Sequence, residues 1–157
     1  MVRKKIYTNK EVKKIVSEYK KLLKKEDVKK VVKYWQKTAE HDYEVMLYLF
    51  KGKKYSESLF FGHIILEKIL KGLVVQETKK QAPYIHDLIR LGEIAKLELS
   101  QDEIKFLNKI NEFNIRARYP EHKLQFYKQC DKEYTKNYFD EIIKLYEKLC
   151  QKLKQKK

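Results

Sequence analysis

The stretch SLFFGHIILEKILKGLVV, residues 58–75, presents apolar side chains on most sides of any helix that it forms. A helix with so little polar surface is stable only when other elements cover it, so we expect it at the centre of a bundle or in a subunit interface. The remaining sequence also favours helices, because its 157 residues include only 4 glycines and 2 prolines. The sequence therefore predicts an all-α fold built around one core.

Apolar residues at intervals of three and four predict the individual helices. They indicate helices at about 9–24, 27–50, 56–77 and 86–97, a fifth from Ser100 to about Pro120, and a last one from Asp131 into the lysine-rich tail. Gly52 stops the second helix, and Pro83 and Pro120 interrupt the pattern. We expect an antiparallel helical bundle of four to five core helices with an extra N-terminal helix. Residues 1–33 are predicted to form a basic helical extension, and residues 34–157 the bundle domain.

The formal net charge of +15 is concentrated at the two ends of the chain. Residues 1–33 contain 13 Lys/Arg and 4 Asp/Glu, and residues 144–157 contain 6 Lys and 1 Glu. Residues 34–143 are nearly balanced, with 18 basic and 17 acidic side chains. Basic ends either attract phosphate backbones without sequence preference or simply keep helix faces solvated.

Several functional classes find no support in the sequence. No stretch approaches the roughly 20 apolar residues of a membrane span, and MVRKKIYTNK lacks the apolar core of a secretion signal. Cys130 and Cys150 lie too far apart along one helix to pair, so we interpret them as free thiols of a cytoplasmic protein. Cysteine and histidine spacing predicts no metal site, and no cofactor is expected. The glycines lack the spacing of a P-loop, which argues against an ATPase.

The stretch NIRARYPEH, residues 114–122, differs from the helical sequence around it. It contains two arginines, a tyrosine, one of the two prolines and one of the four histidines. A structural interpretation assigns Pro120 to the end of a helix and Arg118 to an ion pair with Asp42 or Asp87. His86 and Asp87 are then interpreted as helix-start residues. His63 is expected to be a core or interface histidine.

Several motifs together resemble the HEPN domain family. WQKTAEHDYEVMLYLFKGKKYSESLFFGHIILEKILKGLVV, residues 35–75, is similar to the family's first two helices, with an aromatic-x₆-Asp pattern from Trp35 to Asp42. YIHDLIRL resembles its His-Asp-Leu helix start, and ARYPEH resembles the Arg-Tyr-Pro-Asp signature of one bacterial and archaeal branch, with Glu121 in place of Asp. The resemblance covers about residues 34–150.

The resemblance implies a helical bundle that forms homodimers and accompanies a minimal nucleotidyltransferase, as in toxin–antitoxin pairs. Some branches are metal-independent ribonucleases with an Arg and a His four to six residues apart. Arg116 and His122 have this spacing, although Ala117 stands where ribonucleases of the family usually carry a polar residue. In that case His122 moves a proton and Arg116 or Arg118 stabilises charge on the phosphate.

The same residues also fit a binding site without catalysis. Arginines bind phosphate with a planar fork, and a tyrosine offers a ring on which a base stacks. The residues predicted to bind a nucleotide or RNA phosphate are Asp42, Arg116, Arg118, Tyr119 and His122. Three hypotheses therefore stand at this point: a binding module, a toxin-like ribonuclease, and a purely structural or interaction protein.

Overall fold

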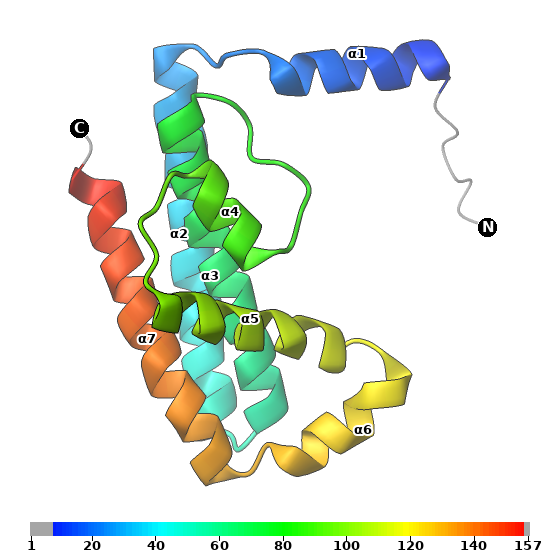
Figure 1. Cartoon of the computed structure of the whole chain (residues 1–157), viewed down its shortest axis with the longest axis vertical. Coiled ribbons are helices and arrows are strands. Elements are labelled where there is room, and N and C mark those ends of the chain that lie inside the picture. Colours follow the sequence, from blue (N-terminus) through cyan, green and yellow to red (C-terminus); the bar gives the residue numbers. More distant parts are fainter. Residues whose placement is uncertain (1–7, 156–157) are drawn as a thin grey trace.

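The computed structural model describes residues 8–155, without the side chains of residues 18–20 and 155. Every regular element in this part of the chain is a helix, so the predicted all-α fold is confirmed (Figure 1). The helices are α1 (Asn9–Lys20), α2 (Lys25–Lys51), α3 (Tyr55–Thr78), α4 (Leu88–Ile94), α5 (Gln101–Arg116), α6 (Pro120–Gln129) and α7 (Lys132–Gln155).

α3 occupies the centre of the bundle, as its apolar sequence predicts. It contacts α2, α4, α5, α6 and α7, and side chains from Leu59 to Val75 are buried along it. α2 runs antiparallel to α3, whereas α7 runs in the same direction as α3 (Figure 1). Gly62 lets α7 approach closely, since a Cβ atom there would lie 2.6 Å from Cδ1 of Ile142.

The apolar side chains of α3 are therefore buried mainly against other helices of the same protomer. Of the two positions expected for residues 58–75, the structure shows the centre of the bundle, because α2 and α7 cover this helix. A dimer face has to be sought on another element.

Two local sequence signals place helix starts as predicted. The Ser100 hydroxyl accepts from the Glu103 N–H (3.1 Å) and the Glu103 carboxylate accepts from the Ser100 N–H (2.9 Å), which is a complete capping box. Thr8 and Glu11 form the same reciprocal pair at the start of α1. The predicted part of the basic extension before Thr8 lies outside the described residues.

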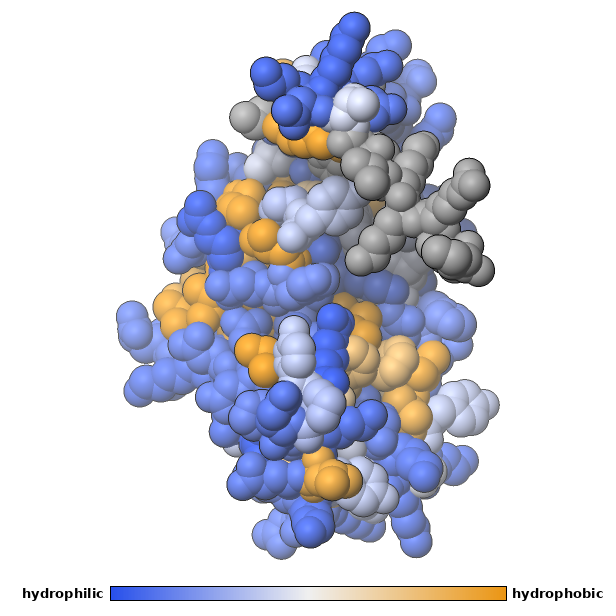
Figure 2. Space-filling model, turned by 90° about the vertical axis from the view of Figure 1, so that its right-hand side faces the viewer, coloured by the Kyte–Doolittle hydropathy of each residue, from blue (hydrophilic) through white to orange (hydrophobic). Residues whose placement is uncertain are grey.

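The ends of the molecule differ from its centre. α1 extends away from the top of the bundle (Figure 1), and Val12, Ile15 and Val16 are exposed on it. The predicted boundary after residue 33 falls inside α2, which is one continuous helix. The side that carries α1 and α6 is mostly hydrophilic, with hydrophobic residues in separate groups (Figure 2).

Candidate functional site

Residues 116–123 form a corner between two helices, which we call the α5–α6 corner. α5 ends at Arg116, where the Arg118 and Tyr119 N–H groups both donate to the carbonyl of Ile115 (3.1 and 3.2 Å). α6 then starts, and the N–H groups of His122 and Lys123 donate to the Tyr119 carbonyl, each at 3.0 Å. The stretch NIRARYPEH is thus a turn between helices.

The interpretation of Pro120 as the end of a helix is wrong. Pro120 is the first residue of α6, a helix that the sequence pattern did not predict. A proline fits this position because the first N–H groups of a helix have no intrahelical acceptor and because its fixed φ suits a helix start.

The α5–α6 corner forms one side of a small pocket of about 260 Å³, which we call the corner pocket. The other side is the first part of α3. The lining residues are Ser56, Glu57, Phe60, Ala117, Arg118, Lys123, Phe126 and Tyr127.

Both arginines of the corner lie over aromatic rings. The guanidinium carbon of Arg118 is 5.2 Å from the centre of the Phe60 ring, and that of Arg116 is 5.0 Å from the centre of the Phe126 ring. These cation–π contacts hold both guanidinium groups close to the protein surface while their N–H groups keep donor capacity.

The charges at the corner pocket favour an anion. Within residues 8–155 no ion pair involves Arg116, Arg118 or Lys123, so their charges are not neutralised by a bound carboxylate. Glu57 also lines the pocket, and its carboxylate accepts from the Ser56 hydroxyl at 3.0 Å. A phosphate group would therefore sit toward Arg118 and Lys123, away from Glu57, with Phe60 or Tyr127 available to contact a base.

Other predicted site residues occupy different positions. Tyr119 and His122 are exposed at the corner but do not line the pocket. Among the described residues no hydrogen bond or ion pair joins Arg116 to His122. The exposed side chain of His122 lies on the first turn of α6.

Asp42 lies outside this group of residues. It is buried on α2, and its carboxylate forms an ion pair with Lys68 of α3. The expected ion pair of Arg118 with Asp42 or Asp87 is absent from the described residues. The Asp42 carboxylate pairs with Lys68, and the Asp87 carboxylate caps α4.

Asp87 caps α4, in agreement with its predicted structural role. Its carboxylate accepts from the N–H groups of Ile89 (3.0 Å) and Arg90 (3.4 Å) and from the side-chain amide of Asn111 (3.0 Å). Helix α4 therefore begins one residue after Asp87 and not at His86 as the sequence suggested.

His86 belongs to a polar cluster on α3 that the sequence did not reveal. Its Nδ1 lies 3.1 Å from both oxygens of Glu67, and its carbonyl accepts from Nε2 of the buried His63 at 3.0 Å. Glu67 also accepts from Lys71 at 2.7 Å. The signal for this cluster is the spacing of His63, Glu67 and Lys71 by four residues, which puts them on one side of α3.

Burial and the neighbouring charges shift the pKa of His63, and likewise that of Glu67, in opposite directions. Burial lowers the pKa of His63 below its ordinary value, although the nearby Glu67 carboxylate opposes this. His63 is therefore neutral at pH 7, and its 3.7 Å approach to Glu67 is not an ion pair. Burial raises the pKa of Glu67, but the hydrogen bond and charge of Lys71, together with the hydrogen bond from His86, outweigh it and lower that pKa.

Six lining residues of the corner pocket were missed by sequence reasoning: Ser56, Glu57, Phe60, Lys123, Phe126 and Tyr127. The first three come from a helix more than fifty positions earlier in the chain, and the other three belong to the unpredicted α6. The unusual composition of residues 114–122 and the resemblance of Ala117–His122 to a family signature indicated this region.

No three His, Cys, Asp or Glu side chains in the described part of the chain lie close enough together to hold a metal ion. No described helix is both long and apolar enough to cross a membrane.

Comparison with known proteins agrees with the arrangement of the helices. The family model described as HEPN domain matches residues 32–156, which run from within α2, seven residues after its start, to the end of α7. No curated protein and no solved structure was found to match the chain.

Proposed function

Because the chain belongs to the HEPN domain family, we propose that it is a dimeric helical module whose corner pocket binds the phosphate group of a nucleotide or of RNA. The observation that carries this proposal is the pairing of two cations, Arg118 and Lys123, with aromatic walls in one pocket. Cations bind the phosphate, and rings contact the base, so the two features together suit a nucleotide better than a simple anion.

A titration of the purified protein with a labelled RNA oligonucleotide tests the proposal. Replacing Arg118 by alanine removes a charged donor worth about 1.5–3 kcal/mol, so we expect the Kd to rise at least about 10-fold. The Kd should also become less dependent on salt, because one phosphate contact is lost. Arg90→Ala is the matched control, since Arg90 is an exposed arginine on α4 that pairs with Glu93. Equal affinity of wild type and Arg118→Ala would contradict the proposal.

We further propose a homodimer and a minimal nucleotidyltransferase as partners, as the family resemblance implies. Co-expression with a nucleotidyltransferase encoded beside this chain should give one complex on size exclusion. Separate elution of both proteins at micromolar concentration would argue against such a pair.

The second candidate function is a metal-independent ribonuclease of the toxin type. The observation in its favour is that His122 is exposed beside the two arginines at the same corner. In this reaction His122 would take the proton of a 2′-hydroxyl, the 2′-oxygen would attack the phosphorus, and the bond to the 5′-oxygen would break as that oxygen takes the proton from His122. Arg116 or Arg118 would stabilise the charge on the phosphate.

Incubation with labelled RNA in EDTA separates the two candidates. A ribonuclease leaves 2′,3′-cyclic phosphate ends with the wild type and loses cleavage in His122→Ala. A binding module gives saturable binding with no cleavage by either protein. Failure to bind nucleotide or RNA at all would favour the third hypothesis, a purely structural or interaction protein.

A further inference from the structure

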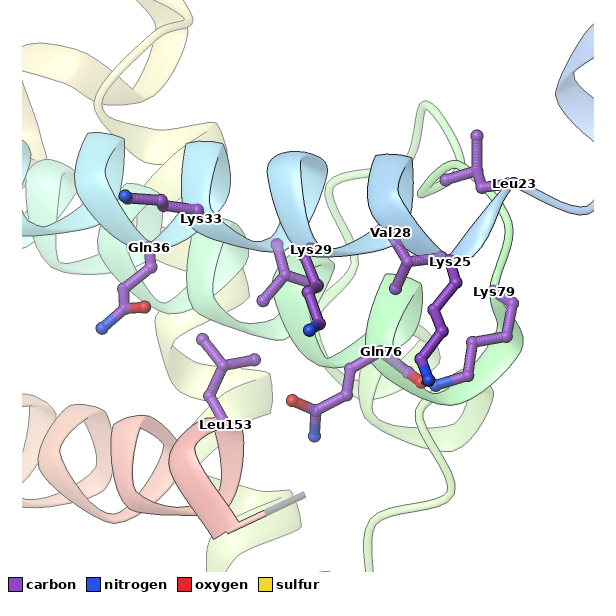
Figure 3. A pocket seen from close by; sticks show the side chains of 10 residues that line it. Leu23, Lys25, Val28, Lys29, Lys33, Gln36, Gln76, Lys79 and Leu153 are labelled. Atoms are coloured by element: carbon purple, nitrogen blue, oxygen red, sulfur yellow. The ribbon is translucent and has the colours of Figure 1, made fainter. Parts of the chain in front are cut away.

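Two open cavities lie end to end between α2 and α7. The first, of about 630 Å³, is lined by Leu23, Lys25, Val28, Lys29, Val32, Lys33, Gln36, Gln76, Lys79 and Leu153 (Figure 3). The second, of about 580 Å³, is lined by Gln36, Glu40, Tyr43, Glu44, Leu47, Tyr146, Glu147, Cys150, Gln151 and Lys154. Because Gln36 lines both cavities, they form one groove along α2, which we call the α2/α7 groove.

The α2 side of the groove carries an ordered row of charges. Lys25, Lys29 and Lys33 come first, Gln36 follows, and Glu40 and Glu44 complete the row. Steps of three and four residues keep these side chains on one side of a helix, over a length of about 29 Å. We call this row the α2 stripe. One half of the groove is therefore basic and the other half acidic.

The charges of the α2 stripe lack partners within the described part of the protomer. All five charged members are exposed, and none takes part in an ion pair there. The one hydrogen bond within the stripe runs from the Gln36 amide to Glu40, at 3.4 Å. Like charges four residues apart repel each other on a helix, so the stripe is unfavourable in an isolated protomer.

The floor of the groove is apolar in both halves. Val32 and Leu153 lie under the basic half, and Figure 3 shows Leu153 of α7 pointing into the space beside α2. Tyr43 stacks on Tyr146 in the acidic half, with ring centres 5.2 Å apart. An occupant of the groove would thus bury apolar surface as well as neutralise charge.

We propose that the occupant is α2 of a second copy of this chain, lying antiparallel in the groove about a twofold axis close to Gln36. Lys33 precedes Gln36 by three residues and Glu40 follows it by four; for Lys29 and Glu44 the separations are seven and eight. The axis therefore places Lys33 opposite Glu40 of the partner subunit and Lys29 opposite Glu44 of the partner subunit. Twofold symmetry repeats each pair, so four ion pairs form from one self-complementary stripe.

The charge order favours a second copy over other occupants. An acidic helix from another protein would match the lysine half but would meet repulsion from Glu40 and Glu44. The exposed α1 helix of the same chain carries Lys10, Lys13 and Lys14, which the lysine half would repel. Only an occupant with the reverse charge order matches both halves, and the stripe itself has that order when it is turned around.

This inference rests on the homodimer of the proposed function and identifies the face that forms it. The α2/α7 groove shares no lining residue with the corner pocket, so the two can fail separately. Arg118→Ala should therefore remain dimeric, and a monomeric groove variant should retain the corner pocket.

Charge reversal in both halves of the stripe tests the proposal. The two variants are Lys29→Glu with Lys33→Glu, and Glu40→Lys with Glu44→Lys. Each makes the stripe uniform in sign, so we expect self-association at 0.15 M salt to weaken about 100-fold or more, because like charges across an interface oppose association. Mixing the two variants in equal amounts places an acidic stripe against a basic one and should restore a 1:1 dimer.

Sedimentation equilibrium gives the association constants, and native mass spectrometry distinguishes the mixed dimer by its mass. Lys105→Glu with Lys132→Glu is the control, since both lysines are exposed on α5 and α7 and the change in charge equals that of the first variant. Circular dichroism checks that each variant is folded. If a double variant is unfolded, the single variants Lys33→Glu and Glu40→Lys replace it in the same mixing experiment.

The outcomes decide the proposal. It stands if the wild type and the control are dimers, both stripe variants are monomers and their mixture is a 1:1 dimer. It is overturned if the wild type is a monomer at the highest concentration that sedimentation equilibrium can measure, if the stripe variants stay dimeric, or if the mixture does not associate. RNA titration of the same variants reports on the corner pocket independently.

Discussion

Replacing Phe126 by alanine should release α6 from the bundle. Among the residues of α6, all of which the structure describes, Phe126 alone is buried. Its ring stacks on Phe113 of α5, with ring centres 5.3 Å apart. The guanidinium carbon of Arg116 lies 5.0 Å from the centre of the Phe126 ring. One buried side chain therefore anchors this helix in the bundle.

The size of the effect follows from this geometry. Truncating a fully buried Phe to Ala costs about 3–5 kcal/mol in a core that cannot close around the gap. A short helix of ten residues has little stability of its own, so losing this contact should undock α6 and leave the rest folded. A loss of about 3 kcal/mol corresponds to roughly 100-fold faster hydrogen exchange of the α6 amides.

Native-state hydrogen exchange by mass spectrometry measures this directly. We expect Phe126→Ala to lose protection in α6 while α3 exchanges as in the wild type, and Phe126→Leu to give an intermediate loss. Tyr127→Ala is the control, because Tyr127 is the next residue and 58% exposed. Unchanged protection of α6 in Phe126→Ala would refute the reasoning, and so would equal loss of protection in α3.

Three further predictions concern the bundle. The unfolded chain protonates His63 at its ordinary pKa, near 6.5, whereas burial lowers the pKa of His63 in the folded state, so the free energy of unfolding should decrease as the pH falls below about 6.5. His63→Gln should flatten that dependence in urea titrations. Asp42→Ala and Lys68→Ala should each lower the free energy of unfolding, and the two losses together should exceed the loss in the double variant. The reason is that either change alone leaves a largely buried charge unpaired. Ser100→Ala should lower the melting temperature through loss of about 1 kcal/mol at the α5 capping box, and equal melting of both proteins would contradict this.

The sequence predicts the helices whose signals are local or strongly periodic. The apolar run of α3 and the Ser100–Glu103 capping box are of this kind, because each follows from residues a few positions apart. α6 was missed because Pro120 was interpreted only as a helix end and because one buried phenylalanine in ten residues gives no periodic pattern. Proline is compatible with the first position of a helix, and tertiary contact with Phe113 supplies what periodicity does not.

The candidate site shows where sequence reasoning reaches its limit. Arg118 was among the predicted residues and lines the corner pocket, because the unusual composition of residues 114–122 marks the turn. Asp42 was grouped with it, yet Asp42 pairs with Lys68 across the α2–α3 interface. Neither the ring of Phe60 beside Arg118 nor this ion pair can be derived from spacing, since both join positions far apart in the chain.

The charge totals of the three segments do not reveal the α2 stripe. Lys25, Lys29 and Lys33 fall in the basic residues 1–33, and Glu40 and Glu44 fall in a middle segment that is close to neutral. Because α2 runs without a break from Lys25 to Lys51, these residues share one side of one helix, and their order along it carries the information that the totals lose. Net charge governs long-range attraction and solubility, whereas the order of charges on a rigid helix determines which surfaces fit together. A reversal of two charges in only one half should therefore weaken the self-association of this protein strongly, while its affinity for polyanions changes only as the net charge does.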